Sequence, residues 1–267
     1  AGASPSKQRS TEVLHEKEIM GDLQFSVEEF KRRYQNIRVA MDSEGIDCLV
    51  ITGTSGWYGA EDANLRYVSG KGIRLEPFFV VFPKRGDPVY IYKQSVFLKR
   101  SPDTGNAPMA TEPSPLKPGT GNAAYFDPTV AQLIKKMGYA KGTIGLVPAR
   151  LTPASTYQEI EKHCPHARIV DAEQLLVKLR RVKSEEEIRF LRRSGYMADV
   201  GMQALVNAVE PGITEHELIL AADNAMVMQG TKPGGFQLLK SGRWQDFGPG
   251  LAQGRPRKVA SGDLVLN

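Results

Sequence analysis

The chain has few of the side chains from which disulfide frameworks and soft-metal sites are built. It contains two cysteines and four histidines in 267 residues. Two cysteines cannot form a disulfide framework, and this scarcity predicts a reducing, cytoplasmic setting. His163 and His166 flank Cys164, but the sequence shows no fourth ligand nearby, so the group does not predict a zinc site.

Long apolar runs and clustered charge are also missing. No run reaches the roughly 18 apolar residues of a membrane-spanning helix, and the first residues have no apolar signal-peptide core, so we expect residues 1–24 to form a loose arm. The formal charge is +5, but the basic residues are dispersed and no basic stripe carries interleaved aromatics. We therefore expect neither a membrane nor a nucleic-acid partner.

The apolar pattern indicates an α/β domain over residues 25–175. Ser26 and Glu29 have capping-box spacing, apolar residues follow at spacings of four, three and four, and Gly45 then ends a helix. The nearly continuous apolar run at 47–52 predicts a strand buried on both faces. Further strands are expected at 77–83, 88–92, 143–147 and 167–170, with helices at 128–137, 153–163 and 172–179 and a surface loop at 101–122.

The pattern changes after Arg181. A long helix over 184–209, a Pro-Gly break at 211–212 and a helix from 214 to 228 are followed by a strand at 236–239 and a Gly-rich loop. The final residues, 262–267, read as a turn and a strand that has only begun. We therefore expect residues 176–267 to be the truncated start of a second domain of a longer protein.

Several phrases resemble the creatinase, prolidase and aminopeptidase P family of pita-bread metallohydrolases. In the second half these are LRRVKS at 179–184 with Glu187 and Ile188, EPGITE at 210–215, and SGDLV at 261–265. In the first half the helix and strand over 30–51 and the phrase NLRYVSG at 64–70 agree with the same family. The resemblance implies a creatinase-like N-terminal α/β domain followed by the first part of an α+β pita-bread domain.

The resemblance also implies a metal-dependent chemistry. In this metallopeptidase family two divalent metals, Mn, Co or Zn, are held by two Asp, one His and two Glu, and they activate a hydroxide against a C–N bond. The first metal Asp is expected just beyond Asn267, so we expect no metal ligand in this chain. Asp263 reads as a turn residue rather than a ligand. The family's peptidases place a His before the Gly-Asp turn, whereas residues 246–250 contain none.

Five residues are candidates for substrate binding. Trp57, Tyr58 and Arg66 lie in a region that, by the resemblance, reaches toward the partner subunit's pocket in a homodimer, where they could close over a substrate and bind an anionic group. Trp244 and Asp246 precede the expected metal strand and could line the pocket. The alternative is that the aromatic residues only pack the loops that carry them.

The sequence thus predicts a homodimeric hydrolase that cleaves a C–N bond in an Xaa-Pro peptide or a small amide or amidino substrate. The isolated chain should be inactive and should expose an unpaired strand edge. Two alternatives remain: a metal-free or altered-site relative acting as a non-peptidase hydrolase or lyase, and a non-catalytic dimerisation module.

Overall fold

The computed structural model describes residues 25–54, 61–70, 78–92, 123–125, 130–231, 238–247 and 254–267. The chain divides into two compact units. The N-terminal unit is Gln24–Glu186, and the C-terminal unit contains Glu187–Asn267. No helix in the described ranges is long and apolar enough to cross a membrane. The expected N-terminal arm at 1–24 and the expected loop at 101–122 lie outside these residues.

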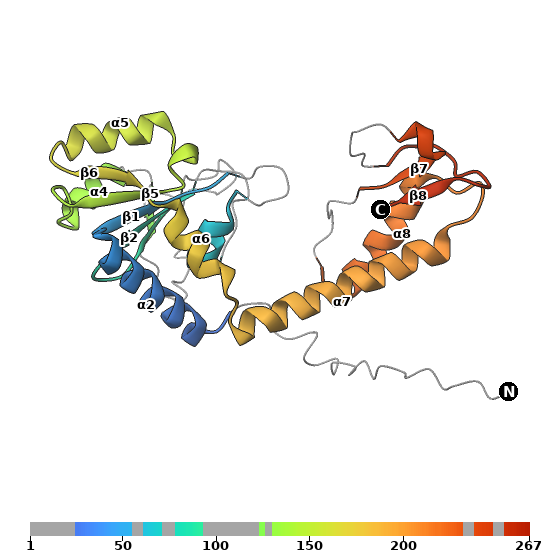
Figure 1. Cartoon of the computed structure of the whole chain (residues 1–267), viewed down its shortest axis with the longest axis horizontal. Coiled ribbons are helices and arrows are strands. Elements are labelled where there is room, and N and C mark those ends of the chain that lie inside the picture. Colours follow the sequence, from blue (N-terminus) through green and yellow to red (C-terminus); the bar gives the residue numbers. More distant parts are fainter. Residues whose placement is uncertain are drawn as a thin grey trace, which may run out of the picture. The chain divides into compact units, whose positions relative to one another are not determined.

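A six-stranded mixed sheet forms the centre of the N-terminal unit, in the order β4-β3-β2-β1-β5-β6 (Figure 1). β1 is parallel to β5, which is parallel to β6, while β2 is antiparallel to both β1 and β3, and β3 is parallel to β4. The antiparallel neighbours β2 and β3 form a hairpin. The strands are β1 Cys48–Ile51, β2 Phe78–Pro83, β3 Val89–Tyr92, β4 Ala123–Tyr125, β5 Thr143–Val147 and β6 Arg168–Asp171.

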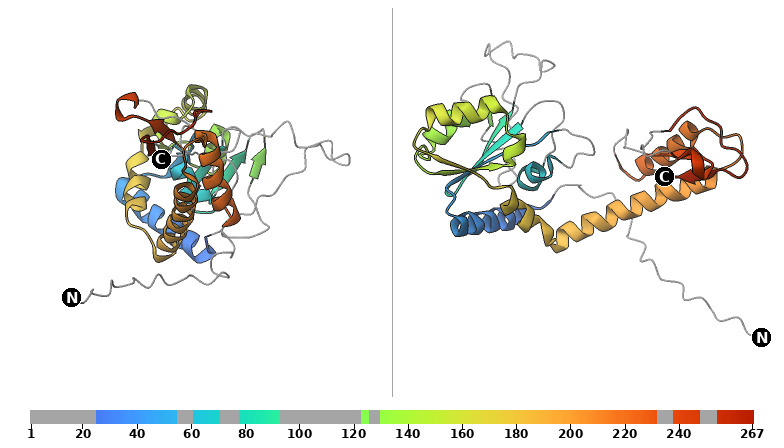
Figure 2. Two further views of the ribbon diagram at one scale, coloured as in Figure 1. Left: turned by 90° about the vertical axis from the view of Figure 1, so that its right-hand side faces the viewer. Right: turned by 45° about the horizontal axis from the view of Figure 1, so that its top comes forward.

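Helices cover both faces of this sheet, as the second view in Figure 2 shows. On one face Leu49 and Ile51 lie in a core with residues of α2 (Val27–Glu44), α3 (Ala63–Ser69) and α6 (Glu173–Arg181). On the other face Cys48 and Val50 pack with residues of α4 (Val130–Lys136) and α5 (Ala154–His163). Successive β1 residues therefore alternate between two cores, and all four are fully buried. This confirms the prediction of a strand buried on both faces.

The first helix begins and ends where the sequence indicates, but its cap is different. The Ser26 hydroxyl accepts a hydrogen bond from the Glu29 amide, and Gly45 ends α2 in the left-handed conformation at φ 65°. Glu29 does not complete the box, because its carboxylate receives hydrogen bonds from Arg32 and the buried Arg33. Glu186 takes its place and accepts hydrogen bonds from the Ser26 amide at 2.6 Å and hydroxyl at 2.7 Å.

The N-terminal unit extends beyond residue 175, where the sequence analysis placed the domain limit. Leu175 and Leu176 of α6 are buried in the core that also contains α2 and α3. Arg180, one turn later, donates a hydrogen bond of 2.8 Å to the side chain of Asn64. Since α6 packs along its length on this unit, the division between the units falls after Glu186.

The C-terminal unit is built on α7 (Glu185–Ala208), which starts at the end of the N-terminal unit, and α8 (Glu215–Met228). Its core contains Leu205, Leu218 and Leu239. A Cβ atom at Gly201 would lie 2.7 Å from the Met226 side chain, so the two helices approach closely at this glycine.

The predicted strand at 236–239 is displaced along the sequence. Strand β7 is Lys240–Gly242, and it pairs antiparallel with β8, Leu264–Leu266. Residues 236 and 237 lie outside the described part. Ser241 of β7 pairs with Val265, and its amide and hydroxyl both donate to the buried Glu215 carboxylate. The short helix η3, Trp244–Asp246, follows β7.

Candidate functional site

The candidate substrate residues fall in different parts of the chain. Trp57 and Tyr58 lie outside the described residues. Arg66 lies on α3 in the N-terminal unit, and Trp244 and Asp246 lie together in η3 of the C-terminal unit.

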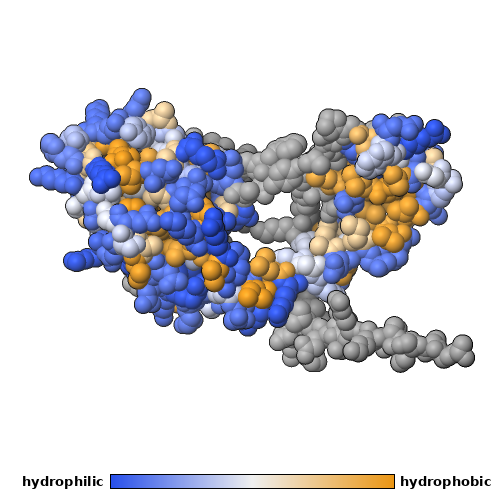
Figure 3. All heavy atoms as spheres, viewed as in Figure 1, coloured by the Kyte–Doolittle hydropathy of each residue, from blue (hydrophilic) through white to orange (hydrophobic). Residues whose placement is uncertain are grey.

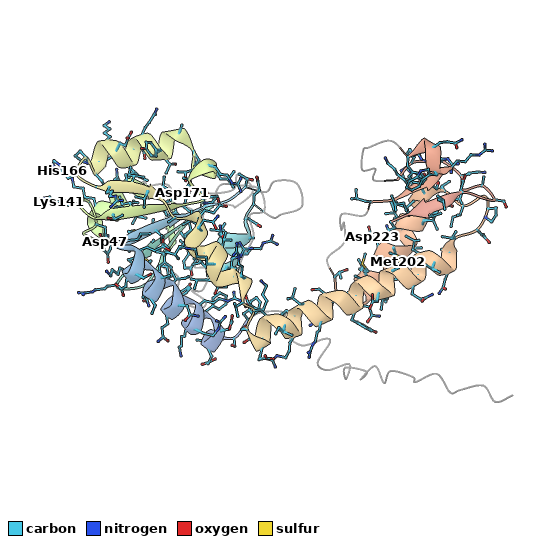
Figure 4. All side chains as sticks on the ribbon, viewed as in Figure 1. Asp47, Lys141, His166, Asp171, Met202 and Asp223 are labelled. Carbon is cyan, nitrogen blue, oxygen red and sulfur yellow. The ribbon has the colours of Figure 1, made fainter. Side chains whose placement is uncertain are left out.

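In the N-terminal unit, polar side chains collect at the carboxyl edge of the parallel strands β1, β5 and β6. The Thr52 amide donates to the Val147 carbonyl, so the segments leaving β1 and β5 remain side by side. Asp171 ends β6, and its carboxylate accepts hydrogen bonds from the amides of Ala149 at 3.5 Å and Glu173 at 3.1 Å. Figure 4 shows Asp171 at the opposite end of the sheet from Asp47, Lys141 and His166. The carboxyl edge of an open α/β sheet is where such folds bind ligands.

Arg150 links the segments that leave these strands. Its guanidinium lies 3.1 Å from the Glu61 carboxylate and 3.6 Å from that of Glu173. The Thr54 hydroxyl donates to the other Glu61 oxygen, which joins the two ends of the segment that carries Trp57 and Tyr58. The hydrogen bonds from Thr54 and Arg150 lower the pKa of Glu61 below its usual value, so it is ionised at neutral pH.

Arg66 forms an ion pair with a buried carboxylate, while about half of its own side chain is exposed to solvent. Its guanidinium lies 2.6 Å from a carboxylate oxygen of Asp62, whose side chain is 5% exposed, whereas that of Arg66 is 48% exposed. A Cβ at Gly53 would approach the Asp62 Cα to 2.7 Å, so only glycine allows the chain after β1 to pass this close. The arrangement holds a partly exposed cation that could bind an anionic group.

The C-terminal unit contains a buried charged network centred on Glu215. Glu215 is fully buried, and its carboxylate accepts two hydrogen bonds from Arg255, at 2.8 and 3.0 Å, besides the two from Ser241 at 2.7 Å. Burial by itself raises the pKa of Glu215, but Arg255 and Ser241 outweigh it and hold the pKa at about 2. These bonds attach the start of α8 to strand β7.

A second ion pair continues this network to the turn before β8. Arg257 donates to the Ser241 hydroxyl at 2.7 Å and to the Asp263 carboxylate at 2.6 Å, and Asp263 also accepts from the Ala260 amide at 2.8 Å. Arg257 and the Ala260 amide lower the pKa of Asp263. Asp263 therefore acts as a turn residue, as the sequence indicated.

Trp244 does not pack beneath the loop that carries it. Its side chain is 80% exposed, and its ring centroid lies 6.5 Å from that of Phe247. A large exposed aromatic side chain beside β7 is available for contact with a ligand or another chain.

The described residues do not form a metal centre. Across the described ranges, no group of three or more His, Cys, Asp or Glu side chains could hold a metal ion. Both cysteines are buried, and burial raises the pKa of each thiol, so neither is a ready thiolate ligand. The donor set that the family resemblance implies is therefore not provided by the described part of this chain.

The sequence model of the creatinase/prolidase N-terminal domain family matches residues 33–182 of this chain. The chain belongs to this family. The match ends within the segment that joins α6 to α7, so it covers the sheet and the helices on both of its faces.

Curated relatives of this creatinase-family chain match both of its units. The creatinase of a Bacillus species is 24% identical over 205 residues, which cover 77% of this chain and 46% of that protein. The ectoine hydrolase of Halomonas elongata is 26% identical over 208 residues, which cover 75% of this chain and 49% of that protein. The chain thus spans about half the length of the curated relatives it matches.

A solved structure supports the fold across both units. The Xaa-Pro dipeptidase of Bacillus anthracis superposes with a TM-score of 0.62 at 20% identity, covering 88% of this chain and 59% of that one. At this level of identity the likeness establishes the fold. It agrees with the predicted creatinase-like α/β domain followed by the start of a pita-bread domain.

The sequence singles out Arg66 as a candidate but gives no indication of the contact between Arg150 and Glu61. Arg66 stands within the family-like phrase at 64–70, which drew attention to it. Arg150 and Glu61 are 89 positions apart and meet only because β1 and β5 are neighbours in the sheet. No local sequence pattern could have indicated this ion pair.

Proposed function

We propose that the protein containing this chain is a creatinase/prolidase-type hydrolase that cleaves a C–N bond in a small amide, amidino or Xaa-Pro substrate. The observation that carries this proposal is the family match over residues 33–182, which the folded sheet and its helices support. The named relatives include a creatinase, an ectoine hydrolase and an Xaa-Pro dipeptidase. Whichever of these substrates the protein takes, the reacting group is a carbon–nitrogen bond.

In this proposal the N-terminal unit binds and encloses the substrate. Arg66, anchored by Asp62, supplies a cation for a carboxylate, and Trp57 and Tyr58 supply apolar cover. The protein acts as a homodimer, in which this edge of one subunit closes over the substrate of its partner. The described residues do not supply the donor set of the two-metal centre that the family implies.

The test begins with the natural protein. Its intact mass and metal content are measured first, and hydrolysis of creatine, ectoine and an Xaa-Pro dipeptide is then followed with and without Mn²⁺, Co²⁺ or Zn²⁺. A mass well above 29.4 kDa, bound divalent metal and turnover of one substrate are the expected results. Residues 1–267 alone are expected to be inactive. A metal-containing, dimeric protein that hydrolyses none of a broad amide and dipeptide panel would contradict the proposal.

One sequence observation favours a second candidate, an altered-site relative. Residues 246–250 contain no histidine where the family's peptidases place one. A longer protein that binds no divalent metal but turns over a small substrate would identify such a non-peptidase hydrolase or lyase. A metal-free, inactive dimer would instead identify a dimerisation module.

A further inference from the structure

A group of exposed cations lies at the amino edge of the N-terminal unit's sheet, away from the candidate substrate site. α4 ends just before β5, and α5 ends just before β6, so the ends of both helices lie at the amino edge of those strands. Figure 4 shows Lys141 and His166 close to each other at this end of the unit. The basic edge is defined here as Arg85, Lys135, Lys136, Lys141, Lys162 and Arg168, all of which are exposed.

Backbone contacts hold the segments of the basic edge together. The Arg168 amide donates to the Gly142 carbonyl, which places Arg168 beside Lys141 across the β5–β6 pair. The Tyr139 hydroxyl accepts a hydrogen bond of 3.2 Å from the Arg85 amide, which joins the β2–β3 turn to the segment after α4. The cations therefore come from separate segments that the fold brings to one edge.

Local structure accounts for only half of these cations. Lys135, Lys136 and Lys162 lie in the last turns of α4 and α5, where a positive charge favours the helix dipole. Arg85, Lys141 and Arg168 have no such role. Within the described part of the chain, none of the three forms a side-chain ion pair, whereas Lys84 is paired with Asp42 at 2.6 Å.

A pocket of about 340 Å³ opens at the same edge. It is lined by Asp47, Lys84, Arg85, Met137 and Tyr139. The Asp47 carboxylate accepts a hydrogen bond of 2.8 Å from the Thr143 amide, so one of its oxygens is bonded to the backbone of β5. The pocket thus combines cationic groups with an apolar and an aromatic side chain.

We propose that the basic edge and its pocket form a docking surface for an acidic protein segment. Glutamate or aspartate side chains of the segment pair with Lys141, Arg168 and Arg85, and an apolar side chain enters the pocket against Met137 and Tyr139. A protein segment fits better than a nucleic acid, because Tyr139 is half-buried and bonded to the Arg85 backbone, which leaves its ring poorly placed for base stacking. The surface is separate from the substrate edge, which lies at the other end of the strands.

The test measures binding of a fluorescein-labelled peptide of alternating glutamate and leucine to the purified full chain by fluorescence anisotropy. We expect binding at low ionic strength that weakens as salt is added, because the exposed charges become screened. The double variant Lys141→Glu/Arg168→Glu should bind about tenfold more weakly. The matched variant Arg181→Glu/Arg189→Glu, with the same charge change at two exposed positions on α6 and α7, should bind as the unchanged chain does.

Three outcomes would overturn the proposal. They are the absence of peptide binding at low salt, an equal loss in the two double variants, and tighter binding of a DNA duplex than of the peptide. Circular dichroism of both variants shows that a loss does not arise from unfolding. A peptide with lysine in place of glutamate should not bind.

Discussion

Replacing Glu215 by glutamine tests whether the charged network holds the C-terminal unit together. The fully buried Glu215 carboxylate accepts four hydrogen bonds, and its pKa falls from an ordinary value of 4.5 to about 2 in the folded chain. Such a carboxyl group stabilises the folded state by about 3 kcal/mol at neutral pH. Glutamine keeps the shape and one acceptor oxygen but loses the charge, so Glu215→Gln should cost about that amount.

The pH dependence gives the sharper measurement. Because the folded pKa lies below the unfolded one, the stabilisation is fully present above about pH 4.5 and is lost as the pH falls toward 2. The free energies of unfolding of the variant and the unchanged chain should therefore differ at pH 7 and converge over this acid range. Urea denaturation followed by circular dichroism at a series of pH values measures both quantities.

Glu217→Gln is the matched control. Glu217 lies on the same helix and completes the capping box with Thr214, but it is exposed to solvent. Its replacement should cost about 1 kcal/mol or less. Equal losses for the two variants at pH 7, or a Glu215→Gln loss that persists to pH 2, would refute the reasoning.

Three further substitutions test the packing and the candidate site. Gly145→Ala should cost about 1–3 kcal/mol in urea denaturation, because the new Cβ would lie 2.7 Å from the Ala172 Cβ and 2.8 Å from a Leu49 methyl group. Gly195→Ala in α7 meets no atom within 4 Å and should stabilise the helix by up to about 1 kcal/mol; a loss of stability would contradict the presence of open space at this position. In steady-state assays of the full-length protein, Arg66→Ala should raise KM for an anionic substrate and leave kcat unchanged, with Arg66→Lys intermediate; a fall in kcat alone would argue against a binding role.

Much of the fold could be predicted because its signals are local. The apolar spacing after Ser26 and the left-handed glycine at position 45 define α2, and the apolar run at 48–51 defines the central strand. In contrast, β4 is an Ala-Ala-Tyr segment without alternation, and it becomes a strand only by pairing with β3. The family phrases added what local patterns could not, namely the nature of the second domain.

Side-chain contacts, those of the candidate site included, could be predicted only in part, because they depend on distant partners. Glu29 has the spacing of a capping residue, but the buried Arg33 needs a counter-ion, and Glu186 is free to take over the Ser26 amide from 160 positions away. Glu215 likewise reads as a helix-start residue, whereas its partner Arg255 lies 40 positions further on. In each case a buried or half-buried charge selects its partner through the tertiary fold.

The two units differ in how their described residues are stabilised, which explains why Glu215 is the informative position. The N-terminal sheet is covered on both faces, so its central strand is fully buried. The C-terminal unit shows a broad apolar area on its surface in Figure 3, and it leaves Leu220 at 57%, Met228 at 79% and Leu266 at 60% exposed. With fewer buried apolar side chains, the attachment of β7 to α8 rests more on the four hydrogen bonds to one carboxylate. Removing that charge should therefore loosen this unit while the N-terminal unit keeps its stability, and hydrogen exchange of the Ser241 amide, which donates to Glu215, reports the difference directly.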